Sequence, residues 1–193
     1  MDLPPFPDRG RAVGVRAATA ADAPLIAGVQ RITWTTAYRD LLPPTVLAGW
    51  DDVATTASWA AAVTDPPTPA HRVLVAVDGA ELVGLAAVAP ADAGPDAAEL
   101  VALLVEPRWG RRGHGSRLLA AATDLARADG TRRMIMWVPE ADPATSGFLA
   151  SAGWAPDGRA RSLAAGTTTV RQLCWHTELD DDRPTAGGGE GAP

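Results

Sequence analysis

The sequence predicts an α+β fold (an α/β three-layer arrangement) with a mixed, mostly antiparallel sheet of about six or seven strands and helices on both faces. Two observations carry this prediction. Residues 72–77 and 81–88 are β-rich runs that flank Asp78-Gly79, a dipeptide suited to a tight hairpin turn, which argues against a purely parallel sheet. Residues 98–138 follow the pattern of strand, glycine loop, helix and strand, which predicts one parallel crossover.

The segment before this hairpin predicts one short strand and two helices. Residues 1–12 carry three prolines and are expected to form a flexible arm, and residues 13–16 a first strand. Thr19 and Asp22 have the spacing of a capping box, so a helix is expected to begin there. Its apolar face is predicted to carry Leu25, Ile26, Val29 and Ile32. A second helical stretch is predicted over residues 45–63, before a proline-rich stop.

The second half begins with an apolar run that Pro107 stops. A Gly/Arg loop follows at residues 111–116, and from Leu118 the apolar positions take helical spacing until Gly130. Asp142-Pro143 predicts the start of a short helix, because an Asp N-cap accepts from free amides and a proline has none to lose. A last hairpin is expected near residues 159–164 and 169–177. Residues 13–179 therefore form one domain, and residues 180–193 a flexible tail.

Composition excludes several classes of function. With 193 residues, of which 47% are hydrophobic, the chain predicts one globular domain. The net charge is −6 and the chain has no lysine, which argues against nucleic-acid binding. Cys174 is the single cysteine and the histidines show no metal spacing, so neither a disulfide nor a metal site is predicted. Without a signal segment or an apolar span, we expect a cytoplasmic protein with no membrane contact, either monomeric or homodimeric.

The glycine loop predicts an anion site, because backbone N–H groups and the positive end of a helix dipole meet there. The phosphate loop GxxxxGK[ST] is excluded, since the chain has no lysine. A dinucleotide loop GxGxxG that began at Gly113 and Gly115 would need a third glycine, and Leu118 stands in its place.

One run of residues resembles a known family. The pattern V-x-P-x-W-x-x-R-G-x-G-S-x-L-L, from Val105 to Leu119, is similar to the cofactor-binding motif of the GNAT superfamily of acetyl-CoA-dependent N-acetyltransferases. Residues 15–22 and 34–43 resemble the opening of small bacterial members, and Phe148 with Gly153-Trp154 resembles the ending of a second motif. The element order over residues 13–179 also matches. The resemblance implies a splayed sheet.

The resemblance further implies acetyl-CoA as co-substrate. Its pyrophosphate would lie on the loop amides, which glycines leave accessible, with Arg111 or Arg112 adding charge. Its pantetheine arm would pair with the backbone of Leu103 and Val105, and an amide there would stabilise the oxyanion formed during transfer. The implied cofactor-binding residues are Leu103, Leu104, Val105, Arg111, Arg112, Gly113, His114, Gly115 and Ser116.

The catalytic residue implied by the resemblance is Glu99. An alkylamine with a pKa near that of lysine, about 10.4, is mostly protonated at neutral pH, so a general base is useful. A solvated carboxylate at a strand edge is the alternative interpretation of Glu99, and Glu81 and Asp96 are weaker candidates for the base. The family also places its acceptor pocket under the first helices, which implies Trp34, Tyr38 and Trp50. Core packing is the alternative for each.

The predicted function is direct transfer of an acetyl group from acetyl-CoA to a primary amine of a small molecule or peptide, in a ternary complex. The chain departs from the family pattern at three positions. Gly110 stands where an Arg or Gln is usual, Asp142 replaces an Asn, and Leu149 replaces the tyrosine that often protonates the thiolate. Two alternatives therefore stay open. One is a non-catalytic CoA-binding or regulatory module, and the other is an enzyme that uses a longer acyl-CoA.

Overall fold

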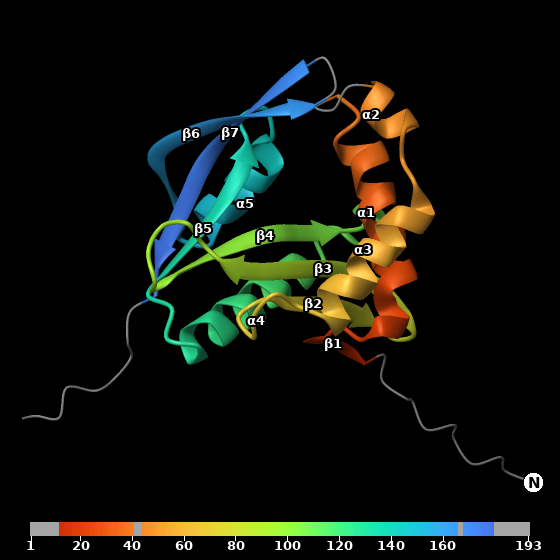
Figure 1. Ribbon diagram of the computed structural model, residues 1–193, viewed down its shortest axis with the longest axis horizontal. Helices are drawn as coiled ribbons and strands as arrows, with labels where there is room; N and C mark the ends of the chain where they lie inside the picture. Colours follow the sequence, from red (N-terminus) through yellow and green to blue (C-terminus); the bar gives the residue numbers. More distant parts are fainter. Residues whose placement is uncertain (1–11, 41–43, 166–167, 180–193) are drawn as a thin grey trace, which may run out of the picture.

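The computed structural model describes residues 12–40, 44–165 and 168–179, so the predicted tail and nearly all of the predicted arm lie outside the described residues. Within these ranges a seven-stranded sheet has the order β1-β2-β3-β4-β5-β7-β6. All neighbouring pairs are antiparallel except β4 and β5. Helices lie on both faces of the sheet, which confirms the predicted fold class (Figure 1).

The elements follow the predicted order, except that three helices and not two precede the first hairpin. The strands are β1 Val13–Ala17, β2 Arg72–Asp78, β3 Glu81–Pro90, β4 Ala97–Val105, β5 Arg133–Pro139, β6 Ala155–Ala165 and β7 Thr168–Glu178. The helices are α1 Ala23–Ala37, α2 Pro44–Ala48, α3 Asp52–Thr64, α4 His114–Ala128 and α5 Pro143–Ser151. Two short 3-10 turns, Ala20–Asp22 and Pro107–Trp109, precede α1 and α4. No helix of the described ranges has the length and apolarity needed to cross a bilayer.

The predicted capping box is present at the entry to α1. The buried Asp22 carboxylate accepts from the Thr19 amide at 2.7 Å and from the Thr19 hydroxyl at 2.8 Å. It also binds the Arg16 guanidinium at 2.7 and 2.8 Å, and these bonds hold the pKa of Asp22 well below its usual range. The predicted buried face needs one correction, because Leu25 is 54% exposed. The helical period instead turns Ile26, Val29 and Thr33 inward.

The predicted second helix is two helices, which corrects the single stretch at 45–63. The chain leaves helical geometry between α2 and α3, where Asp51 has extended backbone angles. The Asp51 carboxylate accepts from the amides of Val53 and Ala54, both at 2.9 Å, and so caps α3. Asp51 is followed by a second aspartate, Asp52, and apolar residues keep their helical spacing on both sides of the pair. The hydrophobic periodicity of the sequence therefore gives no sign of the break.

The sheet divides between β4 and β5. These strands pair only where Ala97–Glu99 faces Arg133–Ile135, and beyond this point β5 continues along β7 instead. Figure 1 shows the two strands diverging from their common start. α1 and α3 cover one face of β1–β4, whereas α4 and α5 pack on the opposite face (Figure 1).

A β-bulge at Val101 changes which face the side chains of β4 occupy. Val88 pairs with Leu100 and Ala87 pairs with Ala102, so Val101 is the extra residue, and it is 56% exposed. Before the bulge, Glu99 lies on the α1 side of the sheet. After the bulge, Leu103 and Val105 pack toward the α4 side, and Leu104 packs toward α1.

Candidate active site

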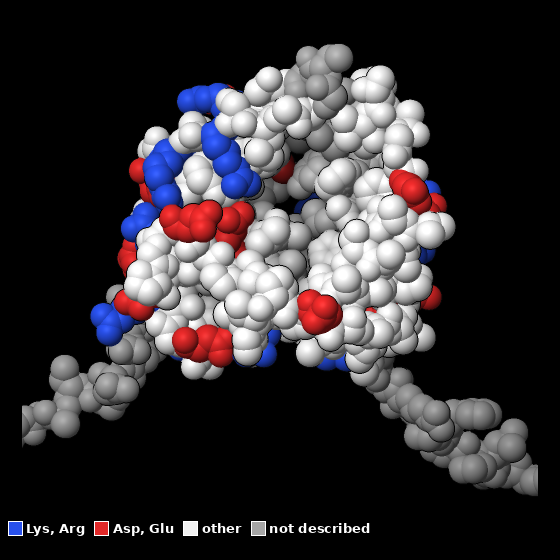
Figure 2. All heavy atoms as spheres, in the orientation of Figure 1, with Lys and Arg blue, Asp and Glu red and all other residues white. Residues whose placement is uncertain are grey.

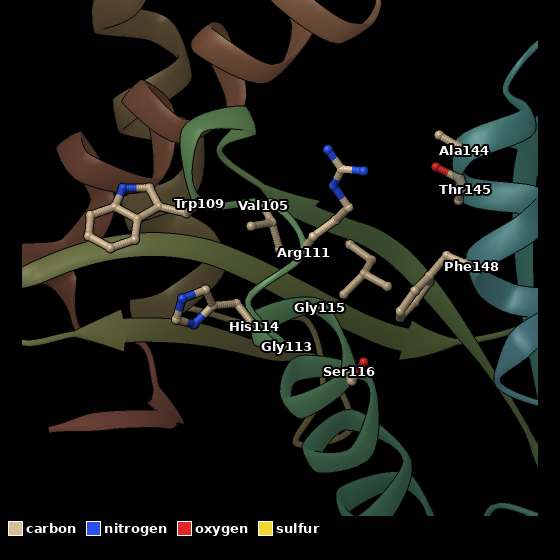
Figure 3. Close-up of a pocket in the computed structure, with 12 residues that line it drawn as sticks. Val105, Trp109, Arg111, Gly113, His114, Gly115, Ser116, Ala144, Thr145 and Phe148 are labelled. Carbon is tan, nitrogen blue, oxygen red and sulfur yellow. The ribbon is translucent and has the colours of Figure 1, made fainter.

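A cavity of about 370 Å³ opens where β4 leaves β5. One wall is the apolar surface of Leu103 and Val105, the floor is the loop that precedes α4, and the other wall is the start of α5 (Figure 3). The residues that line it are Leu103, Val105, Trp109, Gly110, Arg111, Gly113, His114, Gly115, Ser116, Ala144, Thr145 and Phe148.

The loop that precedes α4 has a strongly turned backbone. Arg111 has φ +57° and Gly113, the N-cap of α4, has φ +80°. A Cβ on Gly113 would lie 3.1 Å from Nη1 of Arg117, so a larger residue would be both strained and crowded. The first amides of α4, from His114 to Ser116, have no partner within the helix and lie at its positive end. The structure therefore has a backbone anion site on the floor of the cavity.

Three arginines surround this loop, and they differ in position. Arg111 lines the cavity, and Figure 3 shows its guanidinium extending between Trp109 on one side and Thr145 on the other. Arg112 instead stacks on the Trp109 ring, with its guanidinium carbon 4.9 Å from the ring centroid. Arg117 donates to the Arg112 carbonyl at 3.1 Å and lies beside Gly113. Arg117 thus adds a cation that the sequence interpretation missed.

The backbone groups of β4 point alternately toward β3 and toward the gap that β5 leaves. Glu106 donates its amide to Val83 of β3 at 2.9 Å, and backbone groups alternate sides along a strand. The amide and carbonyl of Leu104 therefore point toward β3, and those of Leu103 and Val105 point toward the gap left by β5. Leu104 is also buried in the α1-side core, so the structure brings only Leu103 and Val105 of the three predicted residues to the cavity.

Glu99 stands at the end of the β4–β5 pairing, on the α1 side of the sheet, and its side chain is 21% exposed. Burial raises the pKa of its carboxyl, the Arg161 guanidinium opposes this rise, and Asp92 adds to it. Figure 2 shows a hollow in this face, between the helices α1–α3 and the strands β5–β7. A partly buried carboxylate with a raised pKa, still 21% exposed, is suited to accepting a proton.

A family model supplies the deciding observation. Residues 32–154 match the acetyltransferase (GNAT) family. The chain belongs to this family.

Solved structures agree on the fold. The PaiA N-acetyltransferase of Thermoplasma acidophilum, in complex with coenzyme A, aligns at a TM-score of 0.73 with 14% identity over 87% of this chain and 99% of its own. YncA of Salmonella typhimurium, with its cofactor acetyl-CoA, aligns at 0.66 with 18% identity over 89% of this chain and 96% of its own. A GCN5-related N-acetyltransferase of Kribbella flavida aligns at 0.65 with 25% identity over 87% and 98%. None of the curated proteins matches by sequence.

His114 of this GNAT chain begins α4, but its imidazole is only 2% exposed. Nε2 lies 3.3 Å from Oδ2 of Asp78, and the ring packs edge-on against Trp109 at a centroid distance of 6.1 Å. Figure 3 shows His114 and Trp109 on the opposite side of the loop from Thr145 and Phe148. His114 therefore offers the cavity its backbone amide, and its side chain joins α4 to the β2–β3 hairpin.

Tyr38 connects α1 to the α5 wall of the cavity. It follows the end of α1, packs against the α1-side core, and its hydroxyl interacts with the side chains of Thr145 and Asp142 at the start of α5. Burial and the Asp142 carboxylate raise the pKa of Tyr38 to about 12. Asp142 in turn accepts from the Thr145 amide at 3.0 Å and from its hydroxyl at 2.7 Å. Tyr38 thus ties the helical layer to the α5 wall of the cavity.

The other residues predicted to line an acceptor pocket lie away from this cavity. Trp34 and Trp50 pack edge-to-face with ring centroids 5.5 Å apart, and the Trp50 indole donates to Asp52 at 2.8 Å. Of the weaker candidates for the base, Glu81 begins β3 at the end remote from Ala89, which pairs with Glu99. Asp96 lies in the loop before β4, where its carbonyl accepts from the Arg132 amide. In the described ranges, no three His, Cys, Asp or Glu side chains form a group able to hold a metal ion.

Two departures from the family pattern have structural explanations. Leu149 is fully buried in the core between α4 and α5, where an apolar side chain packs well, and leucine carries no hydroxyl. Gly110 gives its amide to the Pro107 carbonyl at 3.1 Å, and a Cβ there would lie 3.1 Å from the same oxygen. The pocket residues that the sequence interpretation missed are Trp109, Gly110, Ala144, Thr145 and Phe148. Two signals could have found some of them: Trp109 lies within the motif from Val105 to Leu119, and Phe148 lies near the family-like Gly153-Trp154.

Proposed function

We propose that this GNAT protein is an N-acetyltransferase that moves the acetyl group of acetyl-CoA directly to a primary amine. One observation carries the proposal. The anion loop and its apolar cavity lie on one face of the sheet at the β4–β5 gap, and the Glu99 carboxylate lies on the other face. A donor held on one face and an acceptor held on the other would then meet in the gap. Such an arrangement favours direct transfer in a ternary complex.

The residues around the cavity fit coenzyme A. The amides of His114, Gly115 and Ser116 suit a pyrophosphate, and Gly113 leaves the backbone accessible because it has no Cβ. Arg111 in the cavity and Arg117 beside it supply positive charge for the same group. The apolar surfaces of Val105 and Phe148 suit the pantetheine arm. When bound, the co-substrate supplies a thioester-activated acetyl group.

The gap-facing backbone of β4 supplies the donors that this chemistry needs. The amides of Leu103 and Val105 point away from β3, and β5 does not pair with them. Either amide would orient the thioester carbonyl and stabilise negative charge that develops on its oxygen. The apolar side chains on both residues are compatible with this role, because only the backbone takes part.

Glu99 is proposed as the general base. The amine nitrogen bonds to the acetyl carbon, the C–S bond breaks, and Glu99 accepts the proton that leaves the nitrogen. The sulfur then takes a proton from solvent. A thiol with a pKa of about 8.5 leaves readily as a thiolate, and a Tyr38 phenol with a pKa near 12 is the weaker acid. Tyr38 is therefore assigned to orienting the α5 wall and not to proton delivery.

The test is acetyl transfer from acetyl-CoA to a panel of amines, followed by release of the CoA thiol and by mass of the product. We expect turnover with at least one amine, and a fall of about 100-fold in kcat for Glu99→Gln. Glu81→Gln is the matched control, because Glu81 is 60% exposed and lies at the far end of β3. Full activity of Glu99→Gln would exclude Glu99 as the base.

A second candidate function is a non-catalytic CoA-binding module, which Leu149 favours because it stands where the usual acid, a tyrosine, would be. Tight CoA binding without turnover of any amine would support this candidate over the first. A third is the use of a longer acyl group. Comparing the rates with acetyl-CoA, propionyl-CoA and butyryl-CoA decides it, and a clear preference for acetyl-CoA would exclude it.

A further inference from the structure

The face of the sheet that carries Glu99 also carries a second functional group that no step above uses. Arg161 of β6 pairs in register with Gln172 of β7, and Trp137 of β5 pairs with Cys174 of the same strand. Gln172 and Cys174 are two residues apart, so Arg161 and Trp137 share one face of the sheet. Glu99 shares that face, and α5 covers the opposite one. Figure 2 shows arginine side chains gathered on the β6–β7 side of the hollow.

Arg161 is held in a fixed orientation. Its Nε donates to Oε1 of Gln172 at 2.7 Å, and its guanidinium lies over the Trp137 ring at 4.5 Å from the centroid. Its Nη2 is 3.9 Å from Oε1 of Glu99, which is too long for a hydrogen bond. Within the part of the chain that the structure describes, no acceptor is hydrogen-bonded to either Nη nitrogen. The side chain is 38% exposed, so it is reachable from solvent.

The neighbouring arginine differs in this respect. Arg159 also lies over Trp137, at 5.8 Å, but its Nη2 is 2.7 Å from Oδ2 of Asp157. Asp157 keeps a low pKa, about 2, because its hydrogen bonds with Arg159 outweigh the effect of burial. Arg159 therefore has a close carboxylate partner, which it shares with Arg133. Among the described residues, the one carboxylate paired with Arg161 is the more distant Glu99.

We infer that Arg161 binds the carboxylate of the acceptor, and that the acceptor is an amino acid whose amine lies next to that carboxylate. Opposite charges stand side by side at this place, with Glu99 suited to the amine and the free Nη donors of Arg161 suited to a carboxylate in bidentate contact. The Trp137 ring and Gln172 hold the guanidinium in position before the acceptor arrives, which lowers the cost of binding. This inference rests on the proposed function and specifies its acceptor.

The experiment compares L-amino acids with their own carboxamides as acceptors, with acetyl-CoA as donor. Each pair has the same side chain, and only one member carries the carboxylate. The amine of an amide is less basic and more of it is neutral, so chemistry alone favours the amide. We expect the preferred amino acid to exceed its amide by about tenfold or more in kcat/KM.

The variant Arg161→Gln distinguishes two roles of Arg161: recognition of the acceptor carboxylate, and positioning of the Glu99 side chain. We expect it to lower kcat/KM for the acid by about tenfold, mainly through KM, and to leave the amide within about twofold. Arg161→Lys is expected to recover part of the loss, because it keeps the charge without the planar fork. Arg159→Gln is the matched control, expected to keep the ratio of acid to amide, with folding of each variant checked by thermal unfolding.

Three outcomes would overturn the inference. Equal rates for acids and amides would do so, as would an equal loss on both in Arg161→Gln, which would make Arg161 a positioning residue for Glu99. Turnover of simple alkylamines without turnover of any amino acid would also reject it, while the proposed function would stand. Failure with every amine, despite CoA binding, would instead reject the proposed function.

Discussion

The two sides of the site are built in different ways. The proposed donor side comes from one continuous segment, β4 to α4, and it offers mainly backbone groups shaped by Gly113 and by the N-terminus of α4. The proposed acceptor side is assembled from side chains of β4, β5, β6 and β7, which meet only in the folded sheet. A backbone site leaves a compact sequence motif, whereas a side-chain site assembled across strands leaves none.

The largest expected effect lies on the acceptor side and concerns pH. Glu99 must be ionised to accept a proton, and burial raises its pKa, so kcat/KM should rise with pH through a value above that of an ordinary glutamate. Arg161 lowers the pKa of Glu99, so Arg161→Gln should move this rise to higher pH, measured with an amide acceptor.

Glu99→Gln should remove the rise of kcat/KM with pH and lower the rate about 100-fold, while the affinity for CoA stays unchanged. A loss of CoA affinity in Glu99→Gln would contradict the inference that the donor and acceptor sides bind their substrates independently.

The next effect tests the donor side. Gly113→Ala places a Cβ at φ +80° and 3.1 Å from Arg117, so affinity for CoA should fall about tenfold, as measured by calorimetry. Gly130→Ala is the matched control, because Gly130 has φ +83° with open space around it at the other end of α4. The control should lose similar stability and keep its affinity for CoA. Equal affinity in both variants would contradict the role of the loop.

A smaller effect concerns a region outside both sides, at the entry to α1. The pKa of Asp22 is depressed in the folded chain, so its contribution to the free energy of unfolding is present above its unfolded pKa, about 3.9, and is lost as the pH falls further. Asp22→Asn should lower the free energy of unfolding at pH 7 by about 2 kcal/mol and reduce the loss of stability in acid. Urea unfolding at pH 7 and pH 3 measures both. Activity per folded molecule should stay unchanged.

The smallest expected effect concerns Tyr38, which links the end of α1 to the start of α5. Tyr38→Phe removes a hydroxyl that interacts with Thr145 and Asp142, so unfolding should become easier by about 1 kcal/mol. The change in kcat should stay within about threefold, because the remaining hydrogen bond between Asp142 and Thr145 still orients α5. Loss of about 100-fold in kcat together with a lost basic limb of the pH profile would make Tyr38 the acid instead.

These differences explain how far the sequence could predict the molecule. The glycine loop, the helix start at Asp142 and the hairpin at Asp78-Gly79 depend on local backbone requirements, and all were predictable. The break at Asp51 was not, because side-chain capping there interrupts a continuous apolar pattern. Arg161 and Trp137 were missed because their contact depends on the strand order β5-β7-β6, which brings together residues that are distant in sequence.

The bulge at Val101 has a consequence for how β4 tolerates change in length. Glu99 and Leu103 are four residues apart, and in a regular strand they would share a face. The single extra residue acts as a half-period shift, so the two faces of one strand are free to take the two proposed roles, acceptor on one and donor on the other. Deleting Val101 would leave Glu99 and Leu103 three positions apart, which in a regular strand still places them on opposite faces. The register with β3 therefore tolerates loss of the bulge residue, whereas a regular strand that kept all five residues from Glu99 to Leu103 would put both side chains on one face.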